Sequence, residues 1–183
     1  RLRDGIGHLS GRPRAVLGIG VIAIGHVVMV MVMVMTPVHM AHVDVSLRLI
    51  GLVISVHVAG MYALSPLVGW TVDRVGRVPV VVMGIGILTI ACVLAGIAPG
   101  DDVTLLGVGL FLLGLGWSCT LIAGSTLVTD EVAAPDRPSV QGLSDVMMNA
   151  AGAVGGALAG LIVLASSYSV LCAAALLPLM GLG

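Results

Sequence analysis

The sequence predicts an all-α membrane protein, a polytopic bundle of about six transmembrane helices. Of its 183 residues, 58% are hydrophobic and only 9% are charged, and the mean hydropathy is +1.18. A soluble domain carries about 25% charged residues, so this chain lacks the polar residues that a solvated surface requires. Its hydrophobic residues instead form long runs separated by short polar segments, and about 20 apolar residues suffice for a helix to cross a bilayer.

Six hydrophobic runs are expected to span the membrane, each as one helix. They cover residues 15–35, 48–72, 79–98, 103–128, 139–164 and 167–183, of which the last is the shortest. In the first run valine and methionine alternate, which fits a β-strand by period, but a lone strand in lipid would leave its backbone groups unpaired. We therefore expect a helix there, which Pro37 kinks or stops, followed by an aqueous connection over residues 38–47.

The distribution of arginine predicts the orientation of the chain. Cytoplasmic connections of membrane proteins carry an excess of arginine and lysine. With the amino end inside, the arginines on the cytoplasmic side are Arg1, Arg3, Arg12, Arg14, Arg74, Arg77 and Arg137, and only Arg48 lies outside. We therefore expect residues 1–14 to form a cytoplasmic lead, followed by an even number of crossings.

Several functional classes have no support in the sequence. With a formal net charge of -1 and no basic cluster, the chain offers no surface for a nucleic-acid backbone. Cys92, Cys119 and Cys172 stand far apart inside apolar runs, with neither disulfide nor zinc spacing. No nucleophile–base pair or metal-ligand group is apparent, so we expect no enzyme activity, no cofactor and no metal site.

A densely charged turn, residues 69–79, separates the second and third runs. Its pattern is G-x-x-x-D-R-x-G-R. This pattern resembles the signature cytoplasmic loop of the major facilitator superfamily, whose members are secondary transporters with two related six-helix halves. The resemblance implies a conformational latch that forms and breaks during transport. The residues that it assigns to this latch are Gly69, Asp73, Arg74, Gly76 and Arg77.

A simpler alternative is that this loop only anchors the chain, as arginines do on any cytoplasmic connection. Asp73 bears on the choice. It lies near the carboxyl end of its helix, where the helix dipole disfavours an anion. We therefore expect Asp73 to have a partner, either a nearby arginine or the amino end of another helix.

Two absences indicate which half of such a transporter the chain resembles. The run 103–128 has no arginine and the run 139–164 has no glycine-proline motif, both of which are common in amino-terminal halves of the family. Residues 53–62 and 141–145 look like parts of carboxyl-terminal halves of bacterial permeases. The resemblance therefore implies helices seven to twelve of a protein of the bacterial plasma (inner) membrane, with residues 1–14 left from its central cytoplasmic loop.

Three polar residues in the fifth run are the sharpest candidates for a transport path. Gln141, Asp145 and Asn149 are spaced by four residues and so share one face of a helix. An ionised carboxylate at the bilayer centre costs about 2.5–3.5 kcal/mol on insertion scales, so a retained acid usually faces a cavity or a partner. We expect Asp145 to bind a proton or the solute. The alternative is an acid near the helix start whose side chain reaches the cytoplasm.

His26 and His57 lie near the middle of their runs. Histidine titrates near physiological pH, so either residue could relay a proton inside the membrane. The alternative for each is a neutral, hydrogen-bonded residue of the interior. Trp117 and Thr126 of the fourth run are expected to pack rather than to contact a solute.

Together these features predict secondary transport of a small solute by alternating access, with the proton as the candidate coupling ion. The expected partners are the lipid bilayer, the solute, and either a missing amino-terminal half or a second copy of the chain. The alternative from another class is a non-transporting membrane subunit, or an inactive fragment that serves only as an interaction partner.

Overall fold

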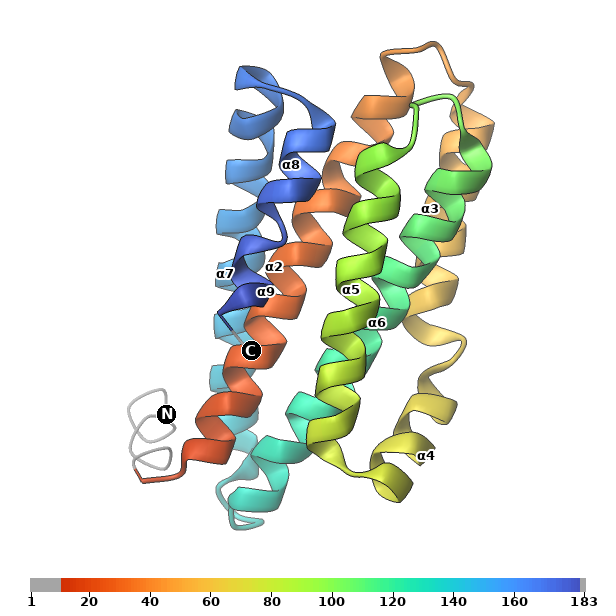
Figure 1. Cartoon of the computed structure of the whole chain (residues 1–183). Helices are drawn as coiled ribbons and strands as arrows, with labels where there is room; N and C mark the ends of the chain where they lie inside the picture. The colour runs from red at the N-terminus through yellow and green to blue at the C-terminus, as the bar shows by residue number, and fades with distance from the viewer. Residues whose placement is uncertain (1–10, 182–183) are drawn as a thin grey trace.

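The computed structural model describes residues 11–181, and this part of the chain is helical, with no strand in it. The helices run up and down in one bundle (Figure 1). They are α2 (Pro13–Ala41), α3 (Leu47–Tyr62), α4 (Ser65–Val75), α5 (Arg77–Ile97), α6 (Val103–Glu131), α7 (Arg137–Ala165), α8 (Tyr168–Ala174) and α9 (Leu177–Met180). The predicted all-α fold is confirmed. Most of the predicted lead, residues 1–10, lies outside the described residues.

Five segments of the described chain are long and apolar enough to cross a membrane, by length and composition. They are α2, the pair α3–α4, α5, α6 and α7. Helices α3 and α4 form one span, Leu47–Val75, with a break at Ala63 and Leu64. Pro66 accounts for the break, because it has no N–H to donate to the carbonyl four residues earlier.

The predicted aqueous connection over residues 38–47 is wrong in its first part, because α2 continues through Pro37 to Ala41. Pro37 removes one backbone donor. In apolar surroundings, however, a continued helix leaves fewer backbone groups unpaired than an early end would. The hydroxyl of Thr36 also donates to the carbonyl of Val32 over 2.8 Å, just before the proline.

The predicted sixth span, residues 167–183, is not one helix. Helix α8 has 7 residues and α9 has 4, so neither is long enough to cross a bilayer. Pro178 lies in the first turn of α9 and has no N–H for the carbonyl of Ala174, where α8 ends. The missing N–H of Pro178 is tolerated in the first turn of α9. It leaves the carbonyl of Ala174 without a donor, however, and α8 therefore ends there. Residues 182–183 lie outside the described part.

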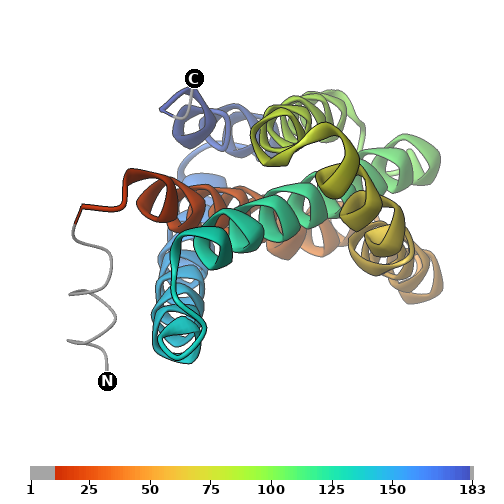
Figure 2. The same ribbon diagram turned by 90° about the horizontal axis from the view of Figure 1, so that it is seen from below.

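Helix α6 lies at the centre of the bundle. It packs against α2, α3 and α5, while α7 packs mainly against α2 (Figure 2). The close approach of α5 and α6 depends on two glycines. A Cβ atom at Gly84 would lie 2.9 Å from Cβ of Cys119, and one at Gly116 would lie 2.8 Å from Cγ of Leu88. Small residues at this crossing let the two backbones meet.

One side of the bundle is left open. Helix α7 and the α3–α4 span stand on one side of the layer formed by α2 and α6, and α5, α8 and α9 cover the other side (Figure 2). Among the five spans α7 is the least buried within the chain, and α6 is the most buried. We call the side between α7 and the α3–α4 span the open face.

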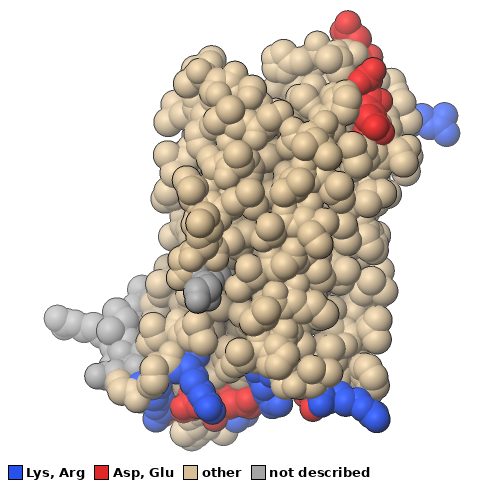
Figure 3. All heavy atoms as spheres, in the orientation of Figure 1, with Lys and Arg blue, Asp and Glu red and all other residues tan. Residues whose placement is uncertain are grey.

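Charged side chains gather at the two ends of the bundle, and the flank between them is apolar (Figure 3). The end with the α4–α5 turn carries both arginines and acids. The opposite end carries acids and one arginine of the described chain, Arg48 at the start of α3. A charge-free middle flanked by charged ends is what a bilayer demands of a surface that faces lipid.

Candidate functional site

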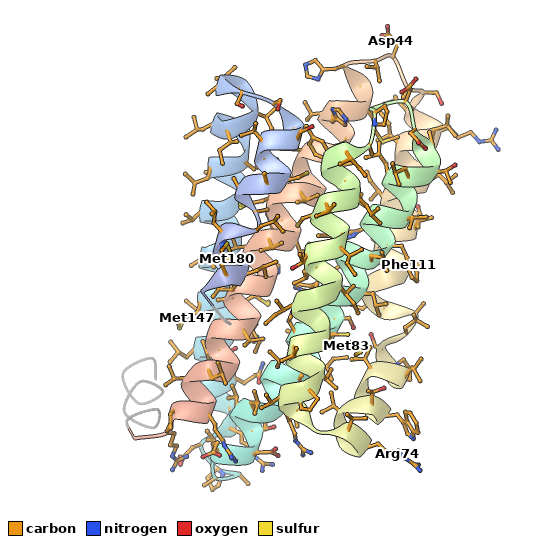
Figure 4. The ribbon with its side chains drawn as sticks, in the orientation of Figure 1. Asp44, Arg74, Met83, Phe111, Met147 and Met180 are labelled. Carbon is orange, nitrogen blue, oxygen red and sulfur yellow. The ribbon has the colours of Figure 1, made fainter. Side chains whose placement is uncertain are left out.

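The turn between α4 and α5 carries the residues assigned to the latch. Gly76 ends α4 with a φ of 104°, a value that residues with a side chain rarely adopt. A Cβ atom at Gly69 would meet no atom within 4 Å, so Gly69 faces open space in this chain. Arg74, at the lower end of the bundle in Figure 4, places its guanidinium carbon 5.3 Å from the ring centre of Trp70. This is a cation–π contact.

Arg77 of the same turn forms an ion pair with Asp130 near the end of α6. Its Nε lies 2.8 Å from Oδ2 of Asp130, and a second nitrogen lies 3.5 Å from Oδ1. Both side chains are partly exposed, and such pairs contribute about 0–1 kcal/mol to stability. Asp73, by contrast, makes no ion pair or hydrogen bond with any described residue. The partner expected for Asp73 is therefore not found in this part of the chain.

Gln141, Asp145 and Asn149 lie along one face of α7. The amide of Gln141 donates to Oδ1 of Asp145 over 3.3 Å, and Asn149 donates to the backbone carbonyl of Asp145 over 2.8 Å. Asp145 is exposed, and its carboxylate has no cationic partner among the described residues. Among residues 11–181, the amide of Gln141 is thus the single hydrogen-bond donor to this carboxylate.

This face of α7 borders a groove of about 490 Å³ between α6 and α7. Its lining residues are Trp117, Leu121, Ile122, Ser125, Thr126 and Thr129 of α6, with Gln141, Asp145 and Met148 of α7. The hydroxyls of Thr126 and Thr129 donate to carbonyls of α6 itself, so they offer oxygen lone pairs to the groove. We call this space the α6–α7 groove.

His26 lies beside Trp117, the residue at the middle of α6. The indole nitrogen Nε1 of Trp117 lies 3.1 Å from Nδ1 of His26. An indole N–H can only donate, so Nδ1 of His26 is the acceptor and Nε2 carries the hydrogen in the neutral ring. Tyr62 of α3 packs edge-on against Trp117, with ring centres 6.1 Å apart. A Cβ atom at Gly152 of α7 would lie 2.6 Å from Cδ2 of His26, so glycine makes room for the imidazole.

His57 occupies a different environment, enclosed between α3 and α6. It is 1% exposed, and its Nδ1 lies 2.8 Å from the carbonyl oxygen of Leu110. A carbonyl can only accept, so Nδ1 of His57 carries the hydrogen. Its Nε2 has no hydrogen-bond partner among the described residues. The two histidines therefore hold opposite tautomers, and only His26 lies near the α6–α7 groove.

Sequence reasoning overlooked three residues of this region. Trp117 was expected only to pack, and neither Tyr62 nor Asp130 was proposed as a site residue. Aromatic residues make up 3% of the chain, so a tryptophan and a tyrosine in neighbouring spans were a signal that could have been used. The signal for Asp130 was weaker, since only its position at the arginine-rich end of its span sets it apart.

Comparison with known proteins agrees with this architecture. The family model described as Major Facilitator Superfamily matches residues 13–182. The chain belongs to the Major Facilitator Superfamily. The resemblance inferred from the α4–α5 turn is thereby confirmed, and the match covers the five spans together with α8 and α9.

Three relatives of the chain come from two bacteria, Bacillus subtilis and Brucella anthropi. The chain is 42% identical over 161 residues to the uncharacterized MFS-type transporter YdeG of Bacillus subtilis, covering 88% of this chain and 37% of that protein. It is 41% identical over 155 residues to the uncharacterized MFS-type transporter YddS of the same organism, covering 85% and 36%. It is 27% identical over 143 residues to the riboflavin transporter RfnT of Brucella anthropi, covering 78% and 35%. The chain thus spans about a third of the length of the curated relatives it matches.

Proposed function

We propose that the chain belongs to the carboxyl-terminal six-helix half of a bacterial secondary transporter, which moves a small solute across the inner membrane by alternating access. The observation that carries the proposal is the carboxylate of Asp145, which has no cationic partner among the described residues and borders a groove on the open face. An acid within a membrane span is costly unless it faces a water-filled path or a partner. Relatives that are named as transporters support the same function.

In this proposal the open face meets a second six-helix half. Related halves of such transporters enclose the solute path between them and rock against each other. The spans that flank the open face, α7 and α3–α4, are the two least buried within this chain, as expected for helices that gain contacts from another half. The second half is an amino-terminal half of the same protein or a second copy of the chain.

The α4–α5 turn acts as a latch on the cytoplasmic side. Arginine-rich ends of membrane proteins lie inside, and this end carries Arg74 and Arg77 next to the turn. Arg77 is held within the half by Asp130. Asp73 has no ion pair with a described residue, and it is the acid that binds a group of the other half. One such group is the amino end of a helix, where an anion is favoured.

Protons are the coupling ion in this proposal, and Asp145 and His26 take them up. A second proton on the His26 ring must bind Nδ1, which accepts the N–H of Trp117 in the structure. Proton binding there breaks that hydrogen bond and frees Trp117, which lines the groove. The other titratable groups of the same face are Tyr62 on α3 and Asp145 on α7. His57 is enclosed between α3 and α6, and its role in this proposal is to hold these two helices together.

Transport in proteoliposomes under an imposed pH gradient tests the proposal. The protein encoded by the reading frame extended upstream is compared with its Asp145→Asn variant, using a panel of small metabolites and organic ions. Riboflavin belongs in the panel because one relative is named as its transporter. We expect uptake or efflux that follows the pH gradient and that Asp145→Asn abolishes.

The matched control is Asp101→Asn, which removes an exposed acid from the turn before α6. Its transport should equal that of the wild type. Transport that is independent of the pH gradient would rule out proton coupling. Transport that is unchanged in Asp145→Asn would mean that Asp145 has only a structural role. A chain that moves no solute but stabilises a separate transporter would support the non-transporting subunit.

A further inference from the structure

A second groove, of about 360 Å³, lies between α3 and α6. Both helices begin at the same end of the bundle (Figure 1). The groove starts at Val103 and Thr104 and reaches Phe111, labelled in Figure 4, and Leu112. At the helical rise of 1.5 Å per residue it runs for about 12 Å along α6, which is most of the depth of one leaflet in a hydrocarbon core of about 30 Å. We call this space the α3–α6 groove.

The α3–α6 groove opens to the flank of the bundle and not to the open face. Val108 lines it and lies nine residues before Trp117. This spacing is two and a half helical turns, so the two residues lie on opposite sides of α6. Val108 is 48% exposed and Leu52, on the α3 side of the groove, is 54% exposed. In a membrane this flank meets lipid, while the open face is the side assigned to the second half.

Polar groups without a partner lie at the mouth of the groove. Leu52 also lines an adjoining hollow together with Ser46, Arg48 and Leu49, so the two spaces are continuous. Arg48 makes no ion pair or hydrogen bond with any described residue. The hydroxyl of Thr104, which lines the groove, has no hydrogen-bond partner in residues 11–181 either. The other groove-lining side chains are apolar.

This order of groups follows the order of groups in a phospholipid. The guanidinium of Arg48 suits a phosphate, which it binds with paired N–H donors. The hydroxyl of Thr104 can donate to an ester carbonyl, and the apolar walls beyond it pack against an acyl chain. Apart from Arg48, the charged residues described at this end are acids. Their field repels a lipid of net negative charge and favours a zwitterion over it.

We propose that the α3–α6 groove binds one zwitterionic phospholipid of the phosphatidylethanolamine type. Its acyl chain lies between α3 and α6, an ester carbonyl accepts from Thr104, and its phosphate binds Arg48. In the orientation proposed above, this lipid belongs to the outer leaflet. The site is separate from the open face, and its binding is measured without transport.

Native mass spectrometry of the full chain tests this inference. The chain is freed of lipid in detergent and titrated with dioleoylphosphatidylethanolamine, with dioleoylphosphatidylglycerol, which carries a net negative charge, and with dioleoylglycerol, which has the same acyl chains but no phosphate. We expect the first phosphatidylethanolamine to bind at least about tenfold more tightly than dioleoylglycerol and more tightly than phosphatidylglycerol.

Two variants test the two parts of the site. Arg48→Gln removes the cation and should reduce the preference over dioleoylglycerol to about twofold or less. Gly107→Leu should fill the groove without a clash, because a Cβ atom at Gly107 meets no atom within 4 Å, and should weaken the binding of both lipids at least about fivefold. The matched controls are Arg14→Gln at the opposite end of the bundle and Gly86→Leu on α5, where a Cβ atom also meets no atom within 4 Å. Both should bind lipid as the wild type does.

Three results would overturn the inference. They are a wild type that binds no phosphatidylethanolamine, tighter binding of phosphatidylglycerol, and binding that Arg48→Gln and Gly107→Leu leave unchanged. A dimer of the chain that Gly107→Leu dissociates would also overturn it, because the groove would then belong to a second copy. None of these results bears on the transport function, which the proteoliposome assay tests by itself.

Discussion

Trp117 donates its indole N–H to Nδ1 of His26 over 3.1 Å, and this bond decides which nitrogen of the imidazole carries hydrogen. His57 is fixed in the opposite sense by the carbonyl of Leu110. Two histidines of the same membrane bundle thus differ in tautomer because one faces a donor and the other an acceptor. The difference matters for proton uptake, since a proton adds to Nδ1 in His26 and to Nε2 in His57.

We predict that neutral His26 is protonated at Nε2 and neutral His57 at Nδ1. Nitrogen NMR of histidine-labelled protein in bilayers at alkaline pH distinguishes the two tautomers, with His26→Gln and His57→Gln used for assignment. Trp117→Phe should remove the preference at His26 and leave His57 unchanged, because only His26 loses a donor. An Nδ1-protonated His26 in the wild type would contradict the assigned hydrogen bond.

Gly152 should be intolerant of a methyl group. A Cβ atom there would lie 2.6 Å from Cδ2 and 2.8 Å from Nε2 of His26, so the ring must turn away from Trp117. Losing that hydrogen bond costs roughly 0.5–1.5 kcal/mol, and the strain of overpacking adds to this cost. We expect Gly152→Ala to lower the stability of the protein in SDS titrations, although alanine is the better helix former.

Gly160→Ala is the matched control for Gly152→Ala, because a Cβ atom at Gly160 of the same helix meets no atom within 4 Å. It should leave stability unchanged or raise it by up to about 1 kcal/mol through helix propensity. The Gly152→Ala cost should largely vanish when His26 is also replaced by alanine, as a double-mutant cycle would show. A cost that persists without the imidazole would place the clash elsewhere.

Sequence reasoning reached the fold and the shared helix face of three polar residues for a physical reason. In a membrane span a hydrophobic run can only be a helix or part of a closed barrel, so composition alone indicates the helices. A spacing of four residues likewise places Gln141, Asp145 and Asn149 on one face. The contact of His26 with Trp117 joins residues 91 positions apart. It depends on how α2 packs against α6, which no local pattern encodes.

The ends of the helices were harder to predict than their existence. Proline at position 37 and proline at position 178 have the same local effect, a missing N–H, yet α2 continues past one and α8 stops before the other. The difference lies in the length of the helix before each proline, since most of α2 precedes Pro37 whereas α8 has 7 residues. A long span loses little by one missing hydrogen bond, whereas a helix of 7 residues has few to lose.

The ion pair between Arg77 and Asp130 should contribute modestly to the stability of the chain. Both groups are partly exposed, so Asp130→Asn is expected to cost no more than about 1 kcal/mol, and the cost should shrink as salt screens the pair. The charge exchange Arg77→Asp with Asp130→Arg should recover part of the loss, as measured in SDS titrations at low and high salt. A large cost that is independent of salt would mean that Asp130 acts through another contact.

Unlike Asp130, Asp73 should not stabilise the chain, because it has no ion pair or hydrogen bond with any described residue. Asp73→Asn is expected to leave the stability of this chain unchanged or to raise it slightly, since no favourable contact is lost and the helix dipole disfavours an anion near the carboxyl end of α4. In the protein extended upstream it should shift the balance between inward-open and outward-open states, as measured by labelling of single cysteines placed at each mouth. Asp130→Asn serves as the comparison at the same end of the bundle. An Asp73→Asn variant that destabilises the chain alone would show that Asp73 has a partner within this half, and the latch between halves would then lose its acid.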